Sequence, residues 1–364
     1  MKKSVLLLIF CVGMAWLAAG QANGKLQIHF IDVGQGDAAL IVSPNGETVL
    51  VDNGIPGHCD MPLSYLEEVG VKKLDYMIIS HYHNDHMACS DKVVEKFPLQ
   101  HYAYDRGGTS TLPEFKRYVA AVGNKRKTAE VGEKIILDAG PAPVTIEFVA
   151  MNGAGVETTN ENDLSLVAVV RFGKFDAVLA GDLSGYDENE YRDIETTVAP
   201  KVGQVEVYKV NHHCSRYSTN EAWIRTIHPR VAVISASGNI GRKHQHPTIE
   251  CLERLHAAGV KTYWTEKGGG APPEEGLDVV GKNIVVEAAP GGSGFTVTWK
   301  GSHTDTYEDW EGASAPVNPT YSWTKSGDTY HYSDCKVARG IKAANLVQGD
   351  TPPPGRHLHA GCPK

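Results

Sequence analysis

Residues 79–87 read ISHYHNDHM, so that three histidines and an aspartate directly follow an apolar run. The run YMII, residues 76–79, predicts a buried β-strand, and the polar cluster stands at its end. Imidazole nitrogens and carboxylate oxygens are the ligands that Zn²⁺ takes in proteins. The cluster therefore predicts a metal site, whereas solvated surface histidines, the alternative, would not explain its place after so apolar a strand. The predicted ligands are His81, His83, Asp85 and His86.

The spacing of these four residues predicts two neighbouring ions. In an extended loop, His81 and His83 point to the same side and can share one ion. Asp85 and His86 lie on the following turn and can face a second ion. Two ions about 3.5–4 Å apart can ionise a bridging water and neutralise charge on an oxyanion. The pattern is thus typical of a dinuclear hydrolytic centre.

Two further strand ends carry residues of the same types. FDAVLAGDL, residues 175–183, contains Asp182 just after its apolar run, and Asp182 is predicted to bridge the two ions rather than to form a plain turn. VEVYKV, residues 205–210, leads into His212 and His213. One of these histidines is expected to complete the ligands of the second ion, and the other to donate a hydrogen bond to substrate. The sequence does not distinguish them, and His212 is taken as the predicted ligand.

Three more residues are candidates for supporting roles. His246 precedes a predicted helix with Pro247 in its first turn, and it either contacts substrate or only begins the helix. Asp52, at the end of TVLVDNG, is predicted to accept an N–H from a ligating histidine, which fixes the tautomer of the ring. Asp37, in DVGQGD, either does the same or braces its turn.

The whole chain is predicted to contain a signal peptide and two globular parts. Residues 1–22 combine two lysines, an apolar run and small residues, which predicts a signal peptide and a secreted or periplasmic protein without a membrane span after its removal. Residues 23–301 alternate hairpins with helices, for example at 187–197 and 221–227, which predicts an α/β fold layered as an αββα sandwich. Residues 302–319 read as a linker, and residues 320–364 as a small cysteine-containing module.

Charge and cysteine content narrow the expectations further. Loss of Lys2 and Lys3 with the signal peptide takes the formal charge from -8 to -10, which argues against broad wrapping of nucleic acid but not against a local basic groove. Six cysteines remain, an even number that predicts disulfides in an exported protein. Because both lie in the short tail, Cys335 and Cys362 are the predicted pair. The other four are Cys59, Cys89, Cys214 and Cys251.

The order of these motifs resembles the metallo-β-lactamase superfamily, and more narrowly its ComEC-like branch, the hydrolase domain attached to the DNA-uptake channel of competent bacteria. The resemblance rests on FIDVGQGDAALI, LVDNG, ISHYHNDHM, NDLSLVAVVRFGKFDAVLAGDL, YKVNHHCSRYS and HQHPTIECLERL, and it covers about residues 25–300. The segments of the membrane channel are absent, so the chain is similar to the free-standing secreted relatives. The tail resembles an Ada-like module but lacks its closing Cys-x-x-Cys.

The resemblance implies an αββα sandwich with two divalent ions, Zn²⁺ or Mn²⁺, at one edge. His81 and His83 would bind one ion, Asp85 and His86 the other, and Asp182 would bridge them, with His212 or His213 completing the second. Where many members have a third histidine for the first ion, this chain has Asn162 and Asp163, as the ComEC-like branch does. Cys214 stands where that branch usually has glycine.

The implied function is a secreted phosphodiesterase or nuclease that cleaves DNA, or another phosphodiester, with a hydroxide activated by the two ions. Asn162, His213 and His246 would contact substrate. The basic residues near the strand ends would either hold the phosphate backbone or only be solvated: Lys209, Arg216, Arg225, Arg242 and Lys243. The alternatives are a phosphocholine esterase-like or other cell-surface phosphoesterase, a β-lactamase or lactonase, and a secreted binding protein without activity.

Overall fold

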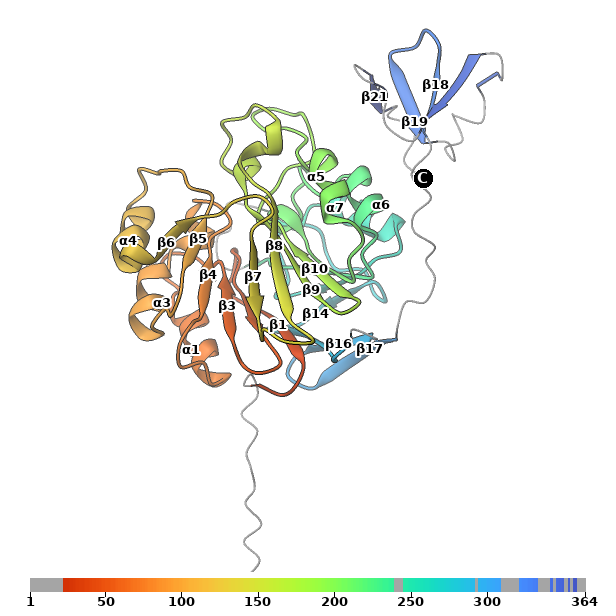
Figure 1. Cartoon of the computed structure of the whole chain (residues 1–364). Helices are drawn as coiled ribbons and strands as arrows, with labels where there is room; N and C mark the ends of the chain where they lie inside the picture. The colour runs from red at the N-terminus through yellow and green to blue at the C-terminus, as the bar shows by residue number, and fades with distance from the viewer. Residues whose placement is uncertain are drawn as a thin grey trace, which may run out of the picture.

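The computed structural model describes residues 22–238, 245–291, 294–308, 321–332, 341–342, 345–349, 353 and 356–358. In this part of the chain two large sheets pack face to face, and helices cover the outer side of each (Figure 1). The predicted αββα sandwich is thereby confirmed. Residues 1–21 of the predicted signal peptide, Arg242, Lys243 and both cysteines of the predicted Cys335–Cys362 pair lie outside the described residues.

Each large sheet has an antiparallel half and a parallel half. In the first sheet the strands from β17 to β3 pair antiparallel and those from β3 to β6 pair parallel. Its order is β17 (His303–Glu308), β16 (Gly294–Trp299), β15 (Ile284–Ala288), β1 (Leu26–Phe30), β2 (Ala39–Val42), β3 (Thr48–Val51), β4 (Tyr76–Ile78), β5 (Ala103–Asp105) and β6 (Arg126–Thr128).

The second sheet repeats this division, with parallel pairing from β10 to β14 and antiparallel pairing from β7 to β10. Its order is β14 (Asp278–Val280), β13 (Lys261–Trp264), β12 (Val231–Ile234), β11 (Val207–Lys209), β10 (Phe175–Leu179), β9 (Val167–Phe172), β8 (Val144–Ala150) and β7 (Lys134–Leu137). The carboxyl ends of neighbouring parallel strands lie at the same edge of a sheet, so β3 and β4 deliver their following residues together, as do β10, β11 and β12.

The helices are divided between the two outer faces. The first sheet is covered by α1 (Asp60–Glu68), α3 (Ser90–Lys96) and α4 (Pro113–Val122), and the second by α5 (Glu195–Val202), α6 (Glu221–Ile227) and α7 (Ile249–Ala257). The short helix α2 (Asn84–Met87) is the turn that follows β4. In the described residues, no helix is both long and apolar enough to cross a membrane.

Two predicted boundaries are wrong. The predicted linker, 302–319, begins too early, because residues 303–308 form β17 and pair with β16 along its whole length. The helix predicted at 187–197 begins only at Glu195, because the Asp193 carboxylate accepts the backbone N–H of Thr196 and closes the first turn there.

In the predicted C-terminal module, the described residues form a separate small sheet. Its order is β20 (Leu346–Gly349), β18 (Tyr321–Thr324), β19 (Thr329–Tyr332) and β21 (His357–Leu358).

The core lies between the two sheets. Its apolar side chains alternate along the strands of both sheets, and aromatic rings meet across the interface. The rings of Tyr104 on β5 and Phe148 on β8 lie 5.1 Å apart, and those of Phe175 on β10 and Phe295 on β16 lie 5.5 Å apart. These contacts hold the two sheets, and therefore the strand ends of both, in one register.

Replacing Phe148 by alanine tests this packing. The side chain is fully buried, so the Phe148→Ala variant should lose about 3–5 kcal/mol of unfolding free energy in chemical denaturation. Ile136 lies on the neighbouring strand β7 and is 53% exposed, so Ile136→Ala should change stability by less than about 0.5 kcal/mol. Equal effects of the two substitutions would contradict the assignment of the core.

Candidate metal centre

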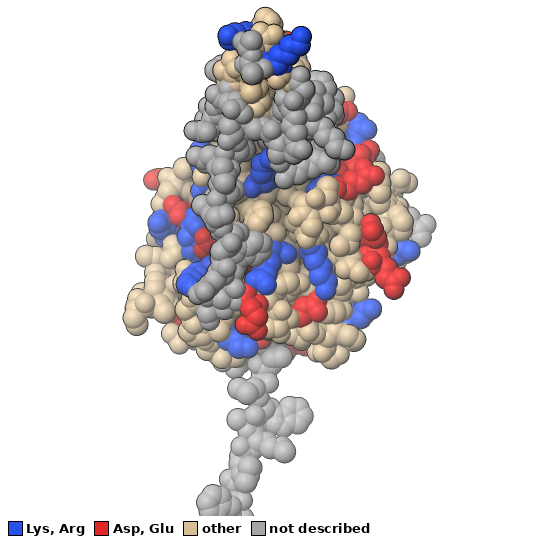
Figure 2. All heavy atoms as spheres, turned by 90° about the vertical axis from the view of Figure 1, so that its right-hand side faces the viewer, with Lys and Arg blue, Asp and Glu red and all other residues tan. Residues whose placement is uncertain are grey.

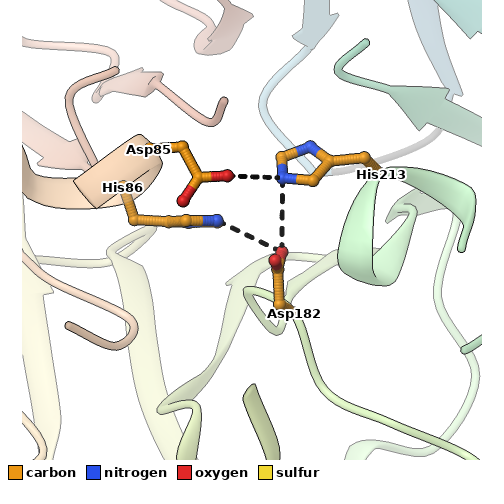
Figure 3. Close-up of side chains that lie close together, drawn as sticks. All are labelled: Asp85, His86, Asp182 and His213. Carbon is orange, nitrogen blue, oxygen red and sulfur yellow. Dashed lines mark ion pairs between the residues drawn. The ribbon is translucent and has the colours of Figure 1, made fainter. Parts of the chain in front are cut away.

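Two groups of ligand-type side chains that have Asp182 in common meet at the edge where the parallel strands of both sheets end. One consists of His81, His83 and Asp182. The other, which Figure 3 shows, consists of Asp85, His86, Asp182 and His213. Within each group, one ligand atom per residue lies within 4.8 Å of all the others. Asp182 belongs to both groups, as expected of a bridging ligand.

Glycine at position 181 allows Asp182 to reach both groups. Gly181 follows β10 and has φ +53, a left-handed conformation that side chains rarely adopt. A Cβ atom there would lie 2.7 Å from Ser80 Oγ and 2.8 Å from Ser80 Cβ, closer than real contacts allow. The backbone of the second sheet can therefore pass directly beside the end of β4.

In the second group, hydrogen bonds to Nδ1 fix which ring nitrogen faces the centre. His86 Nδ1 donates to Asp52 Oδ2 at 2.8 Å, which is the role predicted for Asp52. His213 Nδ1 donates to the backbone carbonyl of Ser235 at 2.9 Å. Both Nε2 atoms therefore carry a free lone pair when the rings are neutral.

The atoms that converge in this group fit a divalent cation. His86 Nε2 lies 3.2 Å from Asp182 Oδ1, and His213 Nε2 lies 3.6 Å from both Asp182 Oδ1 and Asp85 Oδ2. Among the described residues, His86 Nε2, His213 Nε2 and Asp182 Oδ1 are buried and have no hydrogen-bond partner. Because buried polar atoms are almost always satisfied, and because one cation would satisfy all three, the donor set fits a metal ion.

The first group has the spacing of two ligands on one ion. His81 Nε2 lies 3.0 Å from His83 Nδ1, and two nitrogens bound tetrahedrally to one Zn²⁺ would lie about 3.3 Å apart. Ser80 Oγ donates to Asp52 at 2.8 Å and lies 3.1 Å from His81 Nδ1, which orients this ring. Asp52 therefore supports both groups, directly through His86 and through Ser80 for His81.

The pKa values of the histidines in the two ligand groups respond to burial and to the neighbouring carboxylates. Burial lowers the pKa of His81 well below its usual value, with a further contribution from the charge of His86. Burial alone would lower the pKa of His86, but Asp182 and Asp52 outweigh it and hold that pKa well above the usual range. The carboxylates around His86 thus favour a positive charge at this position. A histidine must be deprotonated to bind a metal ion, so affinity is expected to fall in acid.

The geometry favours His213 over the predicted His212 as a ligand, because the ligand group contains His213. His212 Nε2 lies 3.9 Å from Asp182 and accepts a hydrogen bond from Asn162 Nδ2 at 3.4 Å. Both histidines have left-handed backbones, with φ 49 and 52, so the loop turns between them and their rings diverge to 6.5 Å. Local spacing alone does not reveal this turn.

The predicted substrate-side residues gather around His212. Asn162, in the 3-10 turn Asn162–Leu164, is its hydrogen-bond partner. The ring of His246 lies 5.6 Å from that of His212 and 6.2 Å from that of His213. Tyr191, which the sequence did not single out, lies 5.7 Å from the His212 ring.

A buried lysine lies directly behind the second group. Lys209 is only 3% exposed, forms an ion pair with Asp37, and its Nζ donates to the carbonyl of Gly181 at 3.3 Å. Asp37 Oδ1 in turn lies 3.5 Å from His213 Nδ1. Lys209 is therefore no contact for a phosphate backbone. A charged residue inside the apolar strand VYKV was the signal that it has a buried partner.

The loop of residues 211–220, here called the histidine loop, is anchored from inside by Glu195. This carboxylate accepts Asn211 Nδ2 at 2.7 Å and the backbone N–H groups of Thr219 and Asn220 at 2.6 and 2.7 Å. Burial raises the pKa of Glu195 to about 7, although these three donors oppose the shift. Sequence reasoning did not find Glu195, since nothing in its local pattern marks it.

Sequence comparison identifies a protein family and several known proteins that this chain resembles. The sequence profile described as the Metallo-beta-lactamase superfamily matches residues 31–239. ComE operon protein 3 of Bacillus subtilis (strain 168) is 24% identical over 260 residues, which are 67% of this chain and 32% of that protein. Recombination protein 2 of Haemophilus influenzae is 29% identical over 237 residues, 63% of this chain and 26% of that protein. This chain thus spans about a third or less of the relatives it matches.

Solved structures are also similar to this chain, at low sequence identity. A putative metal-dependent hydrolase from Parabacteroides distasonis is 17% identical with a TM-score of 0.40, over 67% of this chain and 94% of that one. The metallo-beta-lactamase fold protein YhfI from Bacillus subtilis is 14% identical with a TM-score of 0.44, over 72% of this chain and 100% of that one.

Exchanging the two neighbouring histidines in turn tests the ligand assignment. His213→Ala removes a ligand atom, so elemental analysis after dialysis should show one bound ion per chain instead of two. His212→Ala should retain both ions, because its ring nitrogen faces Asn162. The reverse pattern, with the ion lost only from His212→Ala, would show that His212 is the ligand and contradict the assignment to His213.

Stability should depend on pH through Glu195. Its pKa is about 7 in the folded protein against 4.5 ordinarily, so between these values the folded state binds more protons and stability falls as pH rises. In Glu195→Gln this group no longer titrates. The stability of wild type relative to the variant should therefore decrease by roughly 2–4 kcal/mol between pH 4.5 and 8 in urea denaturation. A difference that does not change with pH would contradict the shift.

Proposed function

The chain belongs to the metallo-beta-lactamase superfamily, and we propose that within it the protein is an exported phosphodiesterase that cleaves DNA with two divalent ions, Zn²⁺ or Mn²⁺. The observation that carries the proposal is the pair of ligand groups that share Asp182. The similarity to proteins named for competence and recombination supports DNA as the substrate.

Each protein residue has a defined part in this proposal. Bound divalent ions would supply Lewis acidity, lowering the pKa of a water and neutralising charge on the phosphodiester oxygens. Asp182 holds the two groups at a fixed separation. Asp52 and the carbonyl of Ser235 keep the two ligand rings in the tautomer whose Nε2 faces the centre.

His212 acts in this scheme as a neutral hydrogen-bond donor. Burial lowers its pKa to about 4, so the ring is uncharged at neutral pH. Because its Nε2 accepts from Asn162, its proton resides on Nδ1, which is buried and has no hydrogen-bond partner among the described residues. A substrate oxygen that reaches this atom would satisfy its N–H, whereas a protonated His212 serving as a strong acid is disfavoured.

The charge of the loaded centre favours an anionic substrate. Asp37, Asp52, Asp85 and Asp182 carry four negative charges, and Lys209 carries one positive charge, which leaves three negative charges. Two divalent cations bring four positive charges, so the loaded centre carries a single positive charge before it ionises a water. A phosphodiester, with one negative charge, matches it.

A phosphocholine esterase-like or other cell-surface phosphoesterase is the second candidate, supported by the surface charge. On the face shown in Figure 2, Lys and Arg are interspersed with Asp and Glu over the described part of the surface. The formal charge of the whole chain is -8. A small substrate needs only the centre itself, whereas a long polyanion also needs basic contacts around it.

Export is supported by the disulfides. Cys59 pairs with Cys89, and Cys214 pairs with Cys251. Disulfides persist in oxidising compartments and are rare in the cytosol, so they agree with a secreted or periplasmic location.

Cleavage assays test the proposal. The purified protein, loaded separately with Zn²⁺ and Mn²⁺, is expected to cut single- or double-stranded DNA and to hydrolyse bis-p-nitrophenyl phosphate. Asp182→Ala should lower both rates by more than about 100-fold, since a shared ligand matters more than an outer partner. Asp60→Ala, an exposed aspartate on α1, should leave both rates unchanged. Hydrolysis of the small ester alone would favour the cell-surface phosphoesterase, and neither activity would refute both candidates.

A further inference from the structure

The histidine loop has an unusual backbone at the residues that carry the chemistry. His212, His213 and Cys214 all have left-handed conformations, with φ 49, 52 and 64. Side chains other than glycine disfavour this region, and three such residues in succession persist only when the surroundings hold them. The ligand position of His213 therefore depends on contacts outside the loop.

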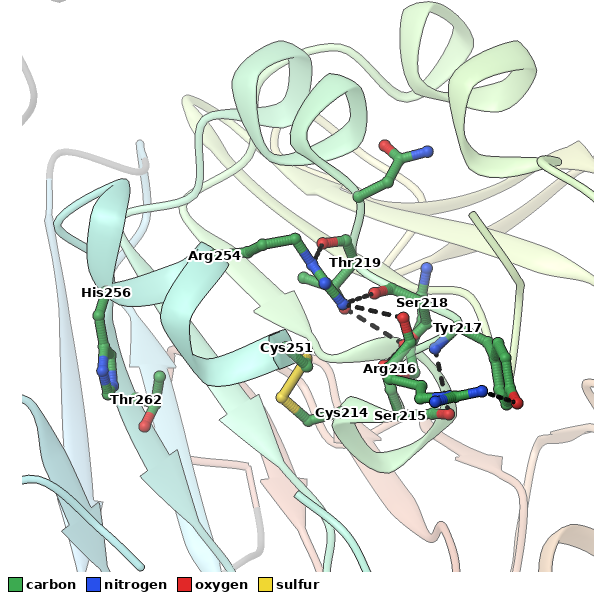
Figure 4. The surroundings of a disulfide bond; sticks show 12 residues. Cys214, Ser215, Arg216, Tyr217, Ser218, Thr219, Cys251, Arg254, His256 and Thr262 are labelled. Carbon is green, nitrogen blue, oxygen red and sulfur yellow. Dashed lines mark hydrogen bonds between the residues drawn. A yellow bond between two sulfur atoms is a disulfide. The ribbon is translucent and has the colours of Figure 1, made fainter. Parts of the chain in front are cut away.

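Helix α7 supplies several of these contacts, and they begin directly after the ligand (Figure 4). Cys251 forms the disulfide with Cys214, the residue that follows His213. The backbone N–H of Thr248, the residue before α7, donates to the carbonyl of Cys214 at 2.9 Å. The disulfide and the hydrogen bond thus attach one residue of the loop to the start of α7.

Arg254, three residues after Cys251 on the same helix, holds the next part of the loop. Its guanidinium donates to the carbonyls of Arg216 at 3.2 Å, Ser218 at 2.8 Å and Thr219 at 2.8 Å (Figure 4). Three acceptors at fixed positions require the planar fork of an arginine, which the single ammonium of lysine does not reproduce. Glu195 accepts the backbone N–H groups of Thr219 and Asn220, so a buried anion and this cation both hold the same part of the loop.

We propose that Cys251 and Arg254 of α7 are positioning residues for His213, and that the second ion is bound tightly only while the Cys214–Cys251 disulfide is intact. This inference rests on the proposed function, because it assumes an ion at Asp85, His86, Asp182 and His213. The first group depends on other segments, since His81 and His83 follow β4 and Asp182 follows β10. Reduction should therefore weaken one site and spare the other.

The redox step in this test is a two-electron reduction of the disulfide. A tertiary phosphine gives two electrons to the disulfide and becomes the phosphine oxide, with its oxygen taken from water. The two protons of that water convert the two sulfurs into the thiols of Cys214 and Cys251. In a reducing environment the protein would hold one ion tightly, and in an oxidising one it would hold two.

The second disulfide provides the matched control. Cys89 lies three residues after His86, but His86 is held independently, through its ring by Asp52 and through its carbonyl by the N–H of Asn53 at 2.8 Å. A Cys59→Ser/Cys89→Ser variant should therefore keep both ions. It also removes the competing disulfide, so the effect of reductant on this variant reports on Cys214–Cys251 within the described part of the chain.

The test measures ion binding to the full chain by equilibrium dialysis against Mn²⁺, with elemental analysis and circular dichroism. Oxidised wild type should bind two ions. Cys214→Ser/Cys251→Ser and Arg254→Lys should each bind the second ion about 10- to 100-fold more weakly and the first unchanged. In Cys59→Ser/Cys89→Ser, tris(2-carboxyethyl)phosphine should produce the same selective loss.

The outcomes separate this inference from the proposed function. If oxidised wild type binds no ions, the proposed function itself fails. If it binds two ions and cleaves substrate, but the folded variants keep second-ion affinity or lose both ions equally, only the positioning role is refuted. Should Cys214→Ser/Cys251→Ser not fold, Arg254→Lys and the phosphine titration decide the question in the same way.

Discussion

The burial of several carboxylates at one edge of the sandwich is the constraint on which the rest of the site depends. Asp37, Asp52 and Asp182 are each no more than 5% exposed, and Asp85 adjoins them. Like charges at such distances are unfavourable unless cations accompany them. Lys209 provides one buried cation, and the carboxylates raise the pKa of His86, which favours a second positive charge before metal is bound. Divalent ions would complete this compensation and would satisfy His86 Nε2, His213 Nε2 and Asp182 Oδ1, which lack hydrogen-bond partners among the described residues.

The two sheets solve the problem of bringing these groups together from distant parts of the chain. Parallel strands end at one edge, so β3, β4, β10, β11 and β12 each deliver a residue there without long loops. The residues that leave the strands must then turn sharply, and Asp52, Gly181, His212 and His213 all have positive φ angles. The regular core supports this local strain, because ring contacts such as Tyr104–Phe148 hold the sheets in register.

What the sequence could predict follows from how local each feature is. The cluster His81–His86 and Asp182 were found because ligand types directly follow apolar strands, and the sandwich followed from the alternation of hairpins and helices. The choice between His212 and His213 depends on a left-handed turn that no residue type announces. The partners of Lys209 and Glu195 lie far away in sequence, as do those of the cysteines. The sequence does not predict β17, because its residues HTDTYE are mostly polar and are typical of a linker. They form a strand because they pair with β16 at the edge of the sheet.

The metal-ligand residues and the α7 residues that hold the histidine loop come from different parts of the chain. Every residue of the two ligand groups is encoded before residue 214, but Cys251 and Arg254, which hold the turn behind His213, come later. The same helix packs its apolar face, Leu252 and Leu255, into the layer over the second sheet. The histidine loop therefore reaches its ligand geometry only when α7 has docked on that sheet. Because the position of His213 depends on α7, the site is completed by the folding of the whole domain and not by the local sequence that supplies its ligands.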